Sequence, residues 1–262
     1  MKPNGFRRGQ RLGKYKLLER LGSGGFAQVY RARDRIEGRD VALKLPHTGS
    51  PFPSVEQLVR EVRIVVGLEH PNILPILNAD VVDGQLVIAC PLGEETLRDR
   101  LRRRISNARA AAIYEQVLDA VAYAHGRRVI HCDINPNNII LAEDDHVWLS
   151  DFGLARVAAR TTGLLGSGSG TVGYISPEQA LGHPSFRSDV FSLGLVGYRL
   201  FAGELPRWPY RWPFPNAKRV KRKLTPEAIT LLRRAVTVEE RKRFRDARQM
   251  LRAWESVDIL RS

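Results

Sequence analysis

A polar run from His131 to Asn138 concentrates reactive side chains in one short stretch of this 262-residue chain. It follows a helical pattern and precedes the apolar run Ile139-Ile140-Leu141. Asp133 and Asn138 stand five positions apart within it. On one loop, the carboxylate could act as a base that orients a hydroxyl group, and the amide could hold a cation. Each residue alone is also ordinary turn chemistry, so the interpretation needs support from the rest of the chain.

A second acidic position follows a second apolar run. Asp151-Phe152-Gly153 comes after Val147-Trp148-Leu149, and Asp151 stands 18 residues beyond Asp133. A carboxylate at the end of a strand is well placed to bind Mg²⁺, which prefers one or two carboxylates together with substrate phosphates. The pattern therefore indicates a metal-dependent phosphate chemistry, with turn punctuation as the alternative.

A glycine-rich turn lies between two strand patterns near the start of the chain. It runs from Leu21 to Val29 and includes Gly22, Gly24 and Gly25. Glycines let backbone N–H groups approach phosphate oxygens with no side chain in the way. Because a strand pattern follows, the turn differs from a dinucleotide-binding fingerprint, which a helix follows. A plain tight turn is the alternative.

Lys44 ends the strand pattern Val41-Ala42-Leu43 and is one of only eight lysines. Its apolar neighbours are typical of a buried lysine, which needs a counter-charge. Glu61 is the natural candidate, because it lies on the next helical pattern, which begins at Val55 with Ser54 as its N-cap. An exposed strand-end lysine is the alternative.

The patterns along the chain predict a small β-rich part followed by a larger helical part. Short alternating runs dominate up to about residue 90, and Asp83-Gly84 predicts a hairpin. Helical spacing dominates from about Leu97 onward. The clearest helices are expected to start near Asn107 and to run from about Ser188 to Phe201.

The net charge is +14, and residues 199–262 contribute +10 of it, with 17 Lys and Arg against 7 Asp and Glu. This excess is either a solvated surface or an attraction for an acidic protein partner. Nucleic acid is not favoured, because no zinc-finger or RNP-like spacing accompanies the charge. No apolar run is long enough to span a bilayer, and the first residues lack the apolar core of a signal peptide. With two cysteines, Cys90 and Cys132, the expected location is the reducing cytoplasm.

Taken together and in this order, these motifs resemble the protein-kinase set. The chain continues in the same way with Gly170 to Glu178, which resembles the family's Ala-Pro-Glu ending, and with Ser188 to Gly194, which resembles its central buried helix. Arg243 stands where the family carries an arginine that pairs with that glutamate, here Glu178. The resemblance covers about residues 11–256 and is greatest to the bacterial, eukaryotic-like (Hanks-type) serine/threonine kinases.

The resemblance implies an α+β, bilobal protein-kinase-like fold, with a small antiparallel β-sheet N-lobe carrying one helix and a larger, mainly helical C-lobe. It divides the chain into a basic N-terminal arm (1–10), the N-lobe (11–90), a hinge (91–93) and the C-lobe (94–262). Within the C-lobe it implies a catalytic loop (131–138), an activation segment (151–178) and the basic last quarter.

The family's roles carry over to matching positions. Lys44 would hold the α- and β-phosphates of ATP while paired with Glu61. Asn138 and Asp151 would bind Mg²⁺, and Asp133 would accept the proton of the substrate hydroxyl. The turn that would cover the phosphates comprises Leu21, Gly22, Ser23, Gly24, Gly25, Phe26, Ala27 and Val29.

The adenine site implied by the resemblance has apolar walls formed by Val29, Ala42 and Ile140. The register of the hinge is open by one or two residues. Adenine needs a backbone C=O and, two positions later, a backbone N–H, and proline has no N–H. Pro91 as acceptor and Gly93 as donor meet this requirement and leave Cys90 at the back of the pocket.

Three positions depart from the family pattern. Cys132 replaces the arginine that grips an activation-loop phosphate, which predicts weaker control by phosphorylation at Thr161, Thr162, Ser167 or Ser169. Asn135 replaces a lysine that lies near the transferring phosphoryl group, so Asn135→Lys is expected to raise turnover. In the chain as it stands, Lys44, Mg²⁺ and Thr171 are expected to compensate in part for the missing positive charge. Ala27 replaces the third glycine of the turn, at little expected cost.

The favoured interpretation is a protein kinase that uses ATP and Mg²⁺ to phosphorylate Ser or Thr of a protein substrate. The main alternative is a pseudokinase that binds nucleotide without transfer, because Cys132 and Asn135 depart from the pattern. A small-molecule phosphotransferase is a second alternative, which the peptide-docking segment ending at Glu178 disfavours. Pro136 and Thr171 disfavour a tyrosine kinase.

Overall fold

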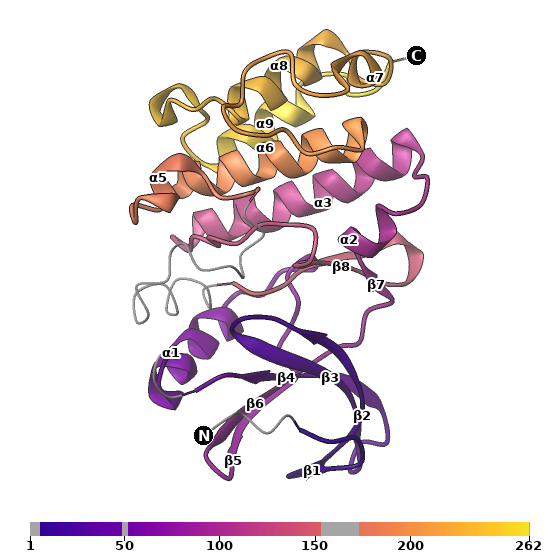
Figure 1. The fold of residues 1–262 in the computed structure, drawn as a ribbon, viewed down its shortest axis with the longest axis vertical. Helices are drawn as coiled ribbons and strands as arrows, with labels where there is room; N and C mark the ends of the chain where they lie inside the picture. Colours follow the sequence, from indigo (N-terminus) through magenta and orange to yellow (C-terminus); the bar gives the residue numbers. More distant parts are fainter. Residues whose placement is uncertain (1–5, 49–51, 153–172, 262) are drawn as a thin grey trace.

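Alternating apolar residues build an antiparallel sheet from the N-lobe. The computed structural model describes residues 6–48, 52–152 and 173–261 (Figure 1). The sheet has the strand order β1-β2-β3-β4-β6-β5. Its strands are β1 (Arg11–Leu12), β2 (Tyr15–Ser23), β3 (Ala27–Asp34), β4 (Asp40–Pro46), β5 (Asn78–Val82) and β6 (Gln85–Cys90).

The two faces of this sheet have different tasks. Val41, Leu43 and Leu45 of β4 point into a closed core on one face. Ala42 and Lys44 alternate with them and therefore lie on the other face. Helix α1 (Val55–Val66) packs on this second face. This second face, which carries Ala42 and Lys44 and lies next to α1, is called the half-open face below.

Local signals in the N-lobe form as the sequence predicts. Ser54 caps α1 in a capping box with Gln57, in which each side chain bonds the backbone N–H of the other residue. Asp83 and Gly84 both have positive φ, 50° and 76°, as a type I′ hairpin between β5 and β6 requires.

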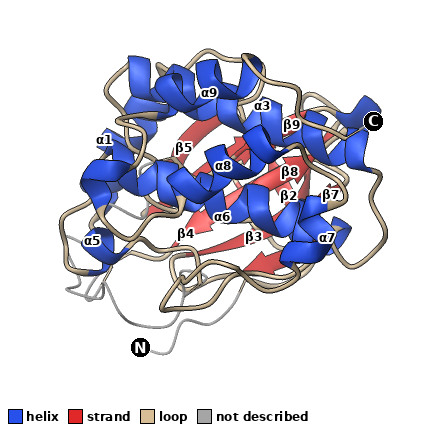
Figure 2. Cartoon of the chain, turned by 90° about the horizontal axis from the view of Figure 1, so that it is seen from above, coloured by secondary structure: helices blue, strands red, loops and turns tan. Residues whose placement is uncertain are grey.

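The C-lobe is mainly helical, and its helices stack beyond a small second sheet (Figures 1 and 2). That sheet has the order β7-β8-β9. Its strands are β7 (Glu95–Thr96), β8 (Ile139–Leu141) and β9 (Val147–Leu149). The helices are α2 (Leu97–Arg100), α3 (Asn107–Gly126), α5 (Pro177–Ala180), α6 (Phe186–Ala202), α7 (Ala217–Lys221), α8 (Pro226–Ala235) and α9 (Ala247–Glu255), with short 3-10 turns η1 (Glu143–Asp145) and η2 (Glu240–Lys242).

Helix α6 forms the centre of the C-lobe and is buried along almost its whole length. Close packing explains two of its glycines: a Cβ at Gly197 would come within 2.6 Å of the Tyr114 ring, and one at Gly194 within 2.7 Å of Ala235. The helix is capped by Gly203, whose φ of 78° lies in the left-handed region that favours glycine. A rigid central helix is a firm base for the loops that pack on it.

The observed architecture confirms the predicted α+β, bilobal fold, with an antiparallel N-lobe sheet, one N-lobe helix and a mainly helical C-lobe. Within the described ranges, no helix combines the length and apolar character needed to cross a membrane.

Candidate active site

The base of the 131–138 loop is held by a buried carboxylate of α6. Asp189 is fully buried and accepts hydrogen bonds from the backbone N–H groups of His131 (2.7 Å) and Cys132 (2.9 Å). His125 lies 2.9 Å from the same carboxylate through Nε2, and its Nδ1 accepts from the Ala247 N–H (3.0 Å). The loop is therefore fastened to three helices.

His131 connects this base to the segment that carries Asp151. Its Nδ1 accepts from the Asp133 N–H at 3.2 Å, so Nε2 carries the proton and donates to the Ser150 carbonyl at 2.9 Å. Burial lowers the pKa of His131, which keeps the ring neutral. The ring also packs against Phe152, with centroids 4.5 Å apart. These contacts fix the two acidic segments relative to each other.

Two amide side chains hold the carboxylate of Asp133. Asn135 Nδ2 donates to its Oδ1 at 2.8 Å, and Asn138 Nδ2 donates to its Oδ2 at 2.9 Å. Burial, reinforced by the negative charge of Asp151, raises the pKa of Asp133 to about 6 against the opposing effect of these amides. The arrangement is an oriented carboxylate that is ionised at neutral pH and weakly basic.

Lys44 and Asp151 bring the two lobes together at this site. The Lys44 ammonium, 16% exposed, forms an ion pair with Oδ1 of Asp151. Asp151 adopts a φ of 69°, in the left-handed region. The predicted pairing of Lys44 with Glu61, which lies half-buried on α1, stays a prediction.

Strand register gathers the predicted adenine-binding side chains on one face. Val29 lies opposite Lys44, and Cys90 lies opposite Ala42. Directly opposed residues of antiparallel strands share a face, so all four side chains belong to the half-open face of the sheet. This agrees with placing Cys90 at the back of the pocket. Burial raises the pKa of its thiol to about 12, so the thiol stays neutral.

The hinge passes directly over Ile140 of β8. A Cβ at Gly93 would overlap the Ile140 side chain and come within 3.1 Å of the Leu141 carbonyl, so only glycine fits there. Among the described residues, no backbone hydrogen bond occupies the Pro91 carbonyl or the Gly93 N–H. Both groups are therefore open to a ligand in the register predicted from the sequence.

The glycine-rich turn joins β2 to β3 next to Lys44. β2 ends at Ser23 and β3 begins at Ala27, and the Gly24 N–H donates to the Ala27 carbonyl at 2.9 Å. Leu21 is exposed, as are Ser23, Gly24 and Gly25, while Gly22 and Phe26 are half-buried. Because Ala27 stands two residues before Val29, the turn lies at the end of the face that carries Lys44.

Two side-chain oxygen atoms at the junction of the lobes are available as ligands for a cation. The Asn138 amide nitrogen is engaged by Asp133, which leaves its oxygen, and the Asp151 carboxylate has Oδ2 beyond the ion pair with Lys44. In the part of the chain that is described, no three His, Cys, Asp or Glu side chains form a metal-binding group. A pair of hard oxygen ligands completed by phosphates suits Mg²⁺ better than a metal that needs a full protein cage.

A buried ion pair anchors the segment that follows the site. Arg243, fully buried, binds Glu178 through two parallel hydrogen bonds of 2.7 and 3.0 Å, which confirms the predicted pair. Burial alone would raise the pKa of Glu178, but the bonds from Arg243 and Ser188 (2.7 Å) outweigh it and lower the pKa. Thr171, the predicted phosphorylation positions and Gly153 lie outside the described residues.

Sequence reasoning missed the residues that support the loop. Asp189 and His125 were not singled out, although an aspartate in an otherwise apolar helix pattern is a usable signal. Arg98 and Asn137, which meet at 3.1 Å beside the loop, carried no signal at all.

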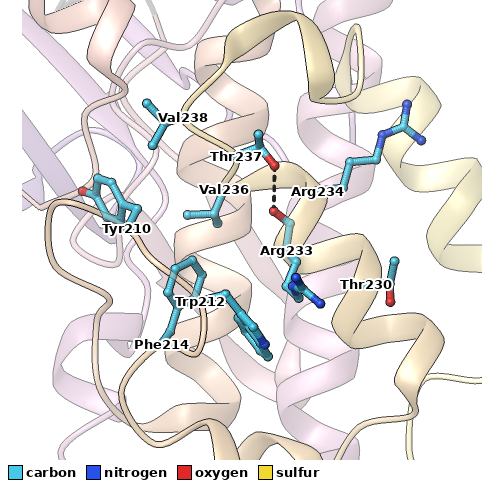
Figure 3. Close-up of a pocket in the computed structure, with 9 residues that line it drawn as sticks. All are labelled: Tyr210, Trp212, Phe214, Thr230, Arg233, Arg234, Val236, Thr237 and Val238. Atoms are coloured by element: carbon cyan, nitrogen blue, oxygen red, sulfur yellow. Dashed lines mark hydrogen bonds between the residues drawn. The ribbon is translucent and has the colours of Figure 1, made fainter.

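A separate cavity of about 450 Å³ opens in the C-lobe between α8 and the segment before α7 (Figure 3). The Arg233 guanidinium stacks over the Trp212 ring at 4.7 Å on its wall. None of the predicted site residues lines this cavity. This cavity is therefore separate from the candidate active site.

Comparison with known proteins identifies the family. The sequence profile of the protein kinase domain matches residues 15–254, so the chain belongs to the protein kinase domain family. Solved kinase domains of Mycobacterium tuberculosis PknI share the fold, one with a TM-score of 0.73 and 25% identity over 96% of this chain and 99% of that chain.

Curated relatives are protein kinases of animals and bacteria. The chain is 34% identical to serine/threonine-protein kinase 36 of Pongo abelii over 76% of this chain and 17% of that protein. It is 35% identical to serine/threonine-protein kinase PknE of Mycobacterium bovis, over 76% of this chain and 37% of that protein. It is 37% identical to the DNA damage-responsive serine/threonine-protein kinase RqkA of Deinococcus radiodurans, over 74% of this chain and 30% of that protein. The chain spans less than half the length of each of these relatives.

Proposed function

We propose that this chain transfers the γ-phosphate of ATP, with Mg²⁺, to serine or threonine hydroxyl groups of protein substrates. The observation that carries the proposal is the meeting of Asp133, held by two amides, with the Lys44–Asp151 pair across the lobes. In the proposal, Asp133 is the base, Lys44 is the phosphate-binding cation, and Asp151 is a metal ligand of the same site.

The residues of the site divide the reaction among them. Asp133 accepts the proton of the attacking hydroxyl group, and its amide partners hold the carboxylate in line. Lys44 neutralises the α- and β-phosphates. Asn138 and Asp151 hold Mg²⁺, which would neutralise charge on the transferring phosphates. Most of the rate gain comes from this positioning and charge.

The nucleotide occupies the half-open face of the N-lobe sheet in this proposal. The Pro91 carbonyl accepts from adenine and the Gly93 N–H donates to it, while Val29, Ala42 and Ile140 enclose the ring. The 21–29 turn covers the phosphates through its backbone N–H groups. The support is the shared strand face and the close approach of Gly93 to Ile140.

We further propose that activity depends only weakly on phosphorylation of the activation segment. Cys132 has no positive charge with which to bind a phosphate, and the loop is already held by Asp189 through backbone N–H groups. We also propose the reducing cytoplasm as the place of action, because the chain has only two cysteines, Cys90 and Cys132, and both are buried. Protein dephosphorylated by a phosphatase should keep at least half of its rate; a loss that rephosphorylation restores would contradict this proposal.

A nucleotide-binding protein without transfer is the second candidate. The observation that favours it is Asn135, a neutral residue only 2% exposed where the family carries a lysine. Against it stand the amide bond that orients Asp133 and the ion pair between Lys44 and Asp151, which support the proposed transfer.

Phosphate transfer separates the two candidates. The protein is incubated with γ-labelled ATP and Mg²⁺, alone and with a generic protein substrate, beside the Asp133→Asn variant. Label on serine or threonine with the wild type alone supports the kinase. ATP-induced thermal stabilisation of both proteins, without transfer by either, supports the second candidate.

A further inference from the structure

Two arginine side chains, one at the 131–138 loop and one at Tyr174, have no acidic partner among the residues that the structure describes. Arg98 belongs to α2 and is exposed, and Arg199 belongs to α6 and is half-buried. Neither takes part in any ion pair formed within the described parts of the chain. An arginine left without a counter-charge next to a catalytic loop is available for an anion.

Arg98 is tied to the loop by backbone and side chain. Its N–H donates to the Pro136 carbonyl at 3.0 Å, and its Nη1 donates to Asn137 Oδ1 at 3.1 Å. Asn137 in turn donates to Asn135 Oδ1 through its backbone N–H (2.9 Å) and its amide (2.8 Å). Because Asn135 holds Asp133, a chain of hydrogen bonds leads from Arg98 to the proposed base.

Arg199 of α6 contacts the segment that begins at Gly173. Its Nη1 donates to the Tyr174 hydroxyl at 2.6 Å. Gln179 of the same segment donates to the Cys132 carbonyl at 2.5 Å, which joins this segment to the loop. Burial raises the pKa of Tyr174, whereas the nearby charges of Arg199 and Arg98 both lower it. Arg199 is therefore joined, through this segment, to the same loop that Arg98 contacts.

Each of these arginines has donors to spare. A guanidinium group carries five N–H donors in a planar fork, and within the described ranges each of these arginines makes one side-chain hydrogen bond. The fork matches the two oxygens of a carboxylate or the oxygens of a phosphate. Like charges that lie near each other repel, and an anion bound by both arginines would remove that repulsion.

We propose that Arg98, which contacts Asn137 of the loop, and Arg199, which contacts Tyr174, form a subsite for an acidic side chain of the protein substrate. The subsite lies next to the position of the serine or threonine that receives the phosphate. The inference rests on the proposed kinase function and names its substrate class: sequences with Asp, Glu or an already phosphorylated residue close to the acceptor.

Peptide phosphorylation tests this subsite. The substrates are serine peptides that differ at a single position. That position carries Asp, phosphoserine, Ala or Lys, and it is moved in turn through every position within four residues of the acceptor serine. The enzymes are wild type, Arg98→Gln and Arg199→Gln, the latter keeping a donor for the Tyr174 hydroxyl. Arg252→Gln is the matched control, because Arg252 is an exposed arginine of α9, outside the subsite.

With the wild type, we expect kcat/KM at one or two positions to be at least 10-fold higher for an anionic residue than for Lys. Each subsite variant should reduce that ratio at least 5-fold by raising KM for the peptides with an anionic residue. Arg252→Gln should keep the wild-type ratio. A preference for phosphoserine without one for Asp assigns the subsite to phosphorylated substrates.

Equal use of the Asp and Lys peptides, or a preference that both subsite variants keep, would overturn the subsite and leave the kinase function intact. If the wild-type protein binds ATP but phosphorylates none of the peptides and no protein, the proposed function itself fails. A thermal melt of each variant identifies a loss that comes from unfolding.

Discussion

Two aspartates serve the 131–138 loop, Asp189 at its base and Asp133 at its tip, and their carboxylates have different surroundings. At the base, Asp189 is fully buried and accepts from the backbone N–H groups of His131 and Cys132, with His125 beside it. At the tip, Asp133 is held by the side-chain amides of Asn135 and Asn138 and remains half-buried.

This difference separates support from chemistry. Backbone N–H groups cannot leave Asp189, so its carboxylate is fully used in holding the loop. Side-chain amides orient Asp133 while one edge of the site stays open, and burial raises its pKa to about 6. Substitutions at the base should therefore change stability, and substitutions at the tip should change rate.

The largest expected effect is that of Asp133→Asn on turnover. The amide keeps the shape but cannot accept the hydroxyl proton, so kcat should fall about 10³-fold. The melting temperature should stay within about 2 °C of wild type, because the tip is not a structural anchor. Steady-state kinetics and a thermal melt measure both quantities. A kcat within 10-fold of wild type would show that Asp133 is not the base.

Asp189→Asn should instead destabilise the fold. An amide offers one acceptor oxygen where the carboxylate serves three donors, so buried N–H groups lose partners. The expected loss in unfolding free energy is about 3 kcal/mol, or on the order of 6–12 °C in melting temperature. Asp144→Asn is the control, because Asp144 is exposed and its φ of 56° suits asparagine. Equal melting temperatures for the two variants would contradict the structural role of Asp189.

Asn135→Lys should lower kcat about 10-fold. The sequence alone predicts a gain from the added cation, but the structure changes this expectation. Asn135 is 2% exposed and holds Asp133 and Asn137 at the same time, and lysine cannot accept the Asn137 bonds. Turnover at saturating ATP measures the effect. A faster variant would show that the missing charge matters more than the geometry of the amide.

The pH profile should show the smallest effect. Because burial raises the pKa of Asp133 to about 6, its reactive carboxylate form is lost as the pH falls through that value. We expect kcat/KM to be roughly half-maximal near pH 6 and to level off above about pH 7. A kcat/KM profile that stays flat down to pH 5 would show that Asp133 is not the group that accepts the hydroxyl proton. The rates should be compared within the pH range where the fold remains intact by circular dichroism.

Much of the fold could be predicted from local patterns. Alternation in β3 and β4, the capping residue Ser54 and the hairpin at Asp83-Gly84 all appear as expected, because short-range sterics and hydrogen bonds determine them. The pairing of Glu178 with Arg243 was also expected, although only through the family resemblance.

The sequence by itself determined which chemical groups are present: Asp133, Asn138, Asp151 and Lys44, and the strand face that carries Lys44 with Ala42. Only the tertiary structure decided what each group touches. Pairing of Lys44 with Asp151 joins residues 107 positions apart, and the hydrogen bond from Arg199 to Tyr174 joins α6 to the segment before α5. Such contacts depend on how whole helices and sheets pack, and that packing is a sum over many distant side chains which no local pattern contains.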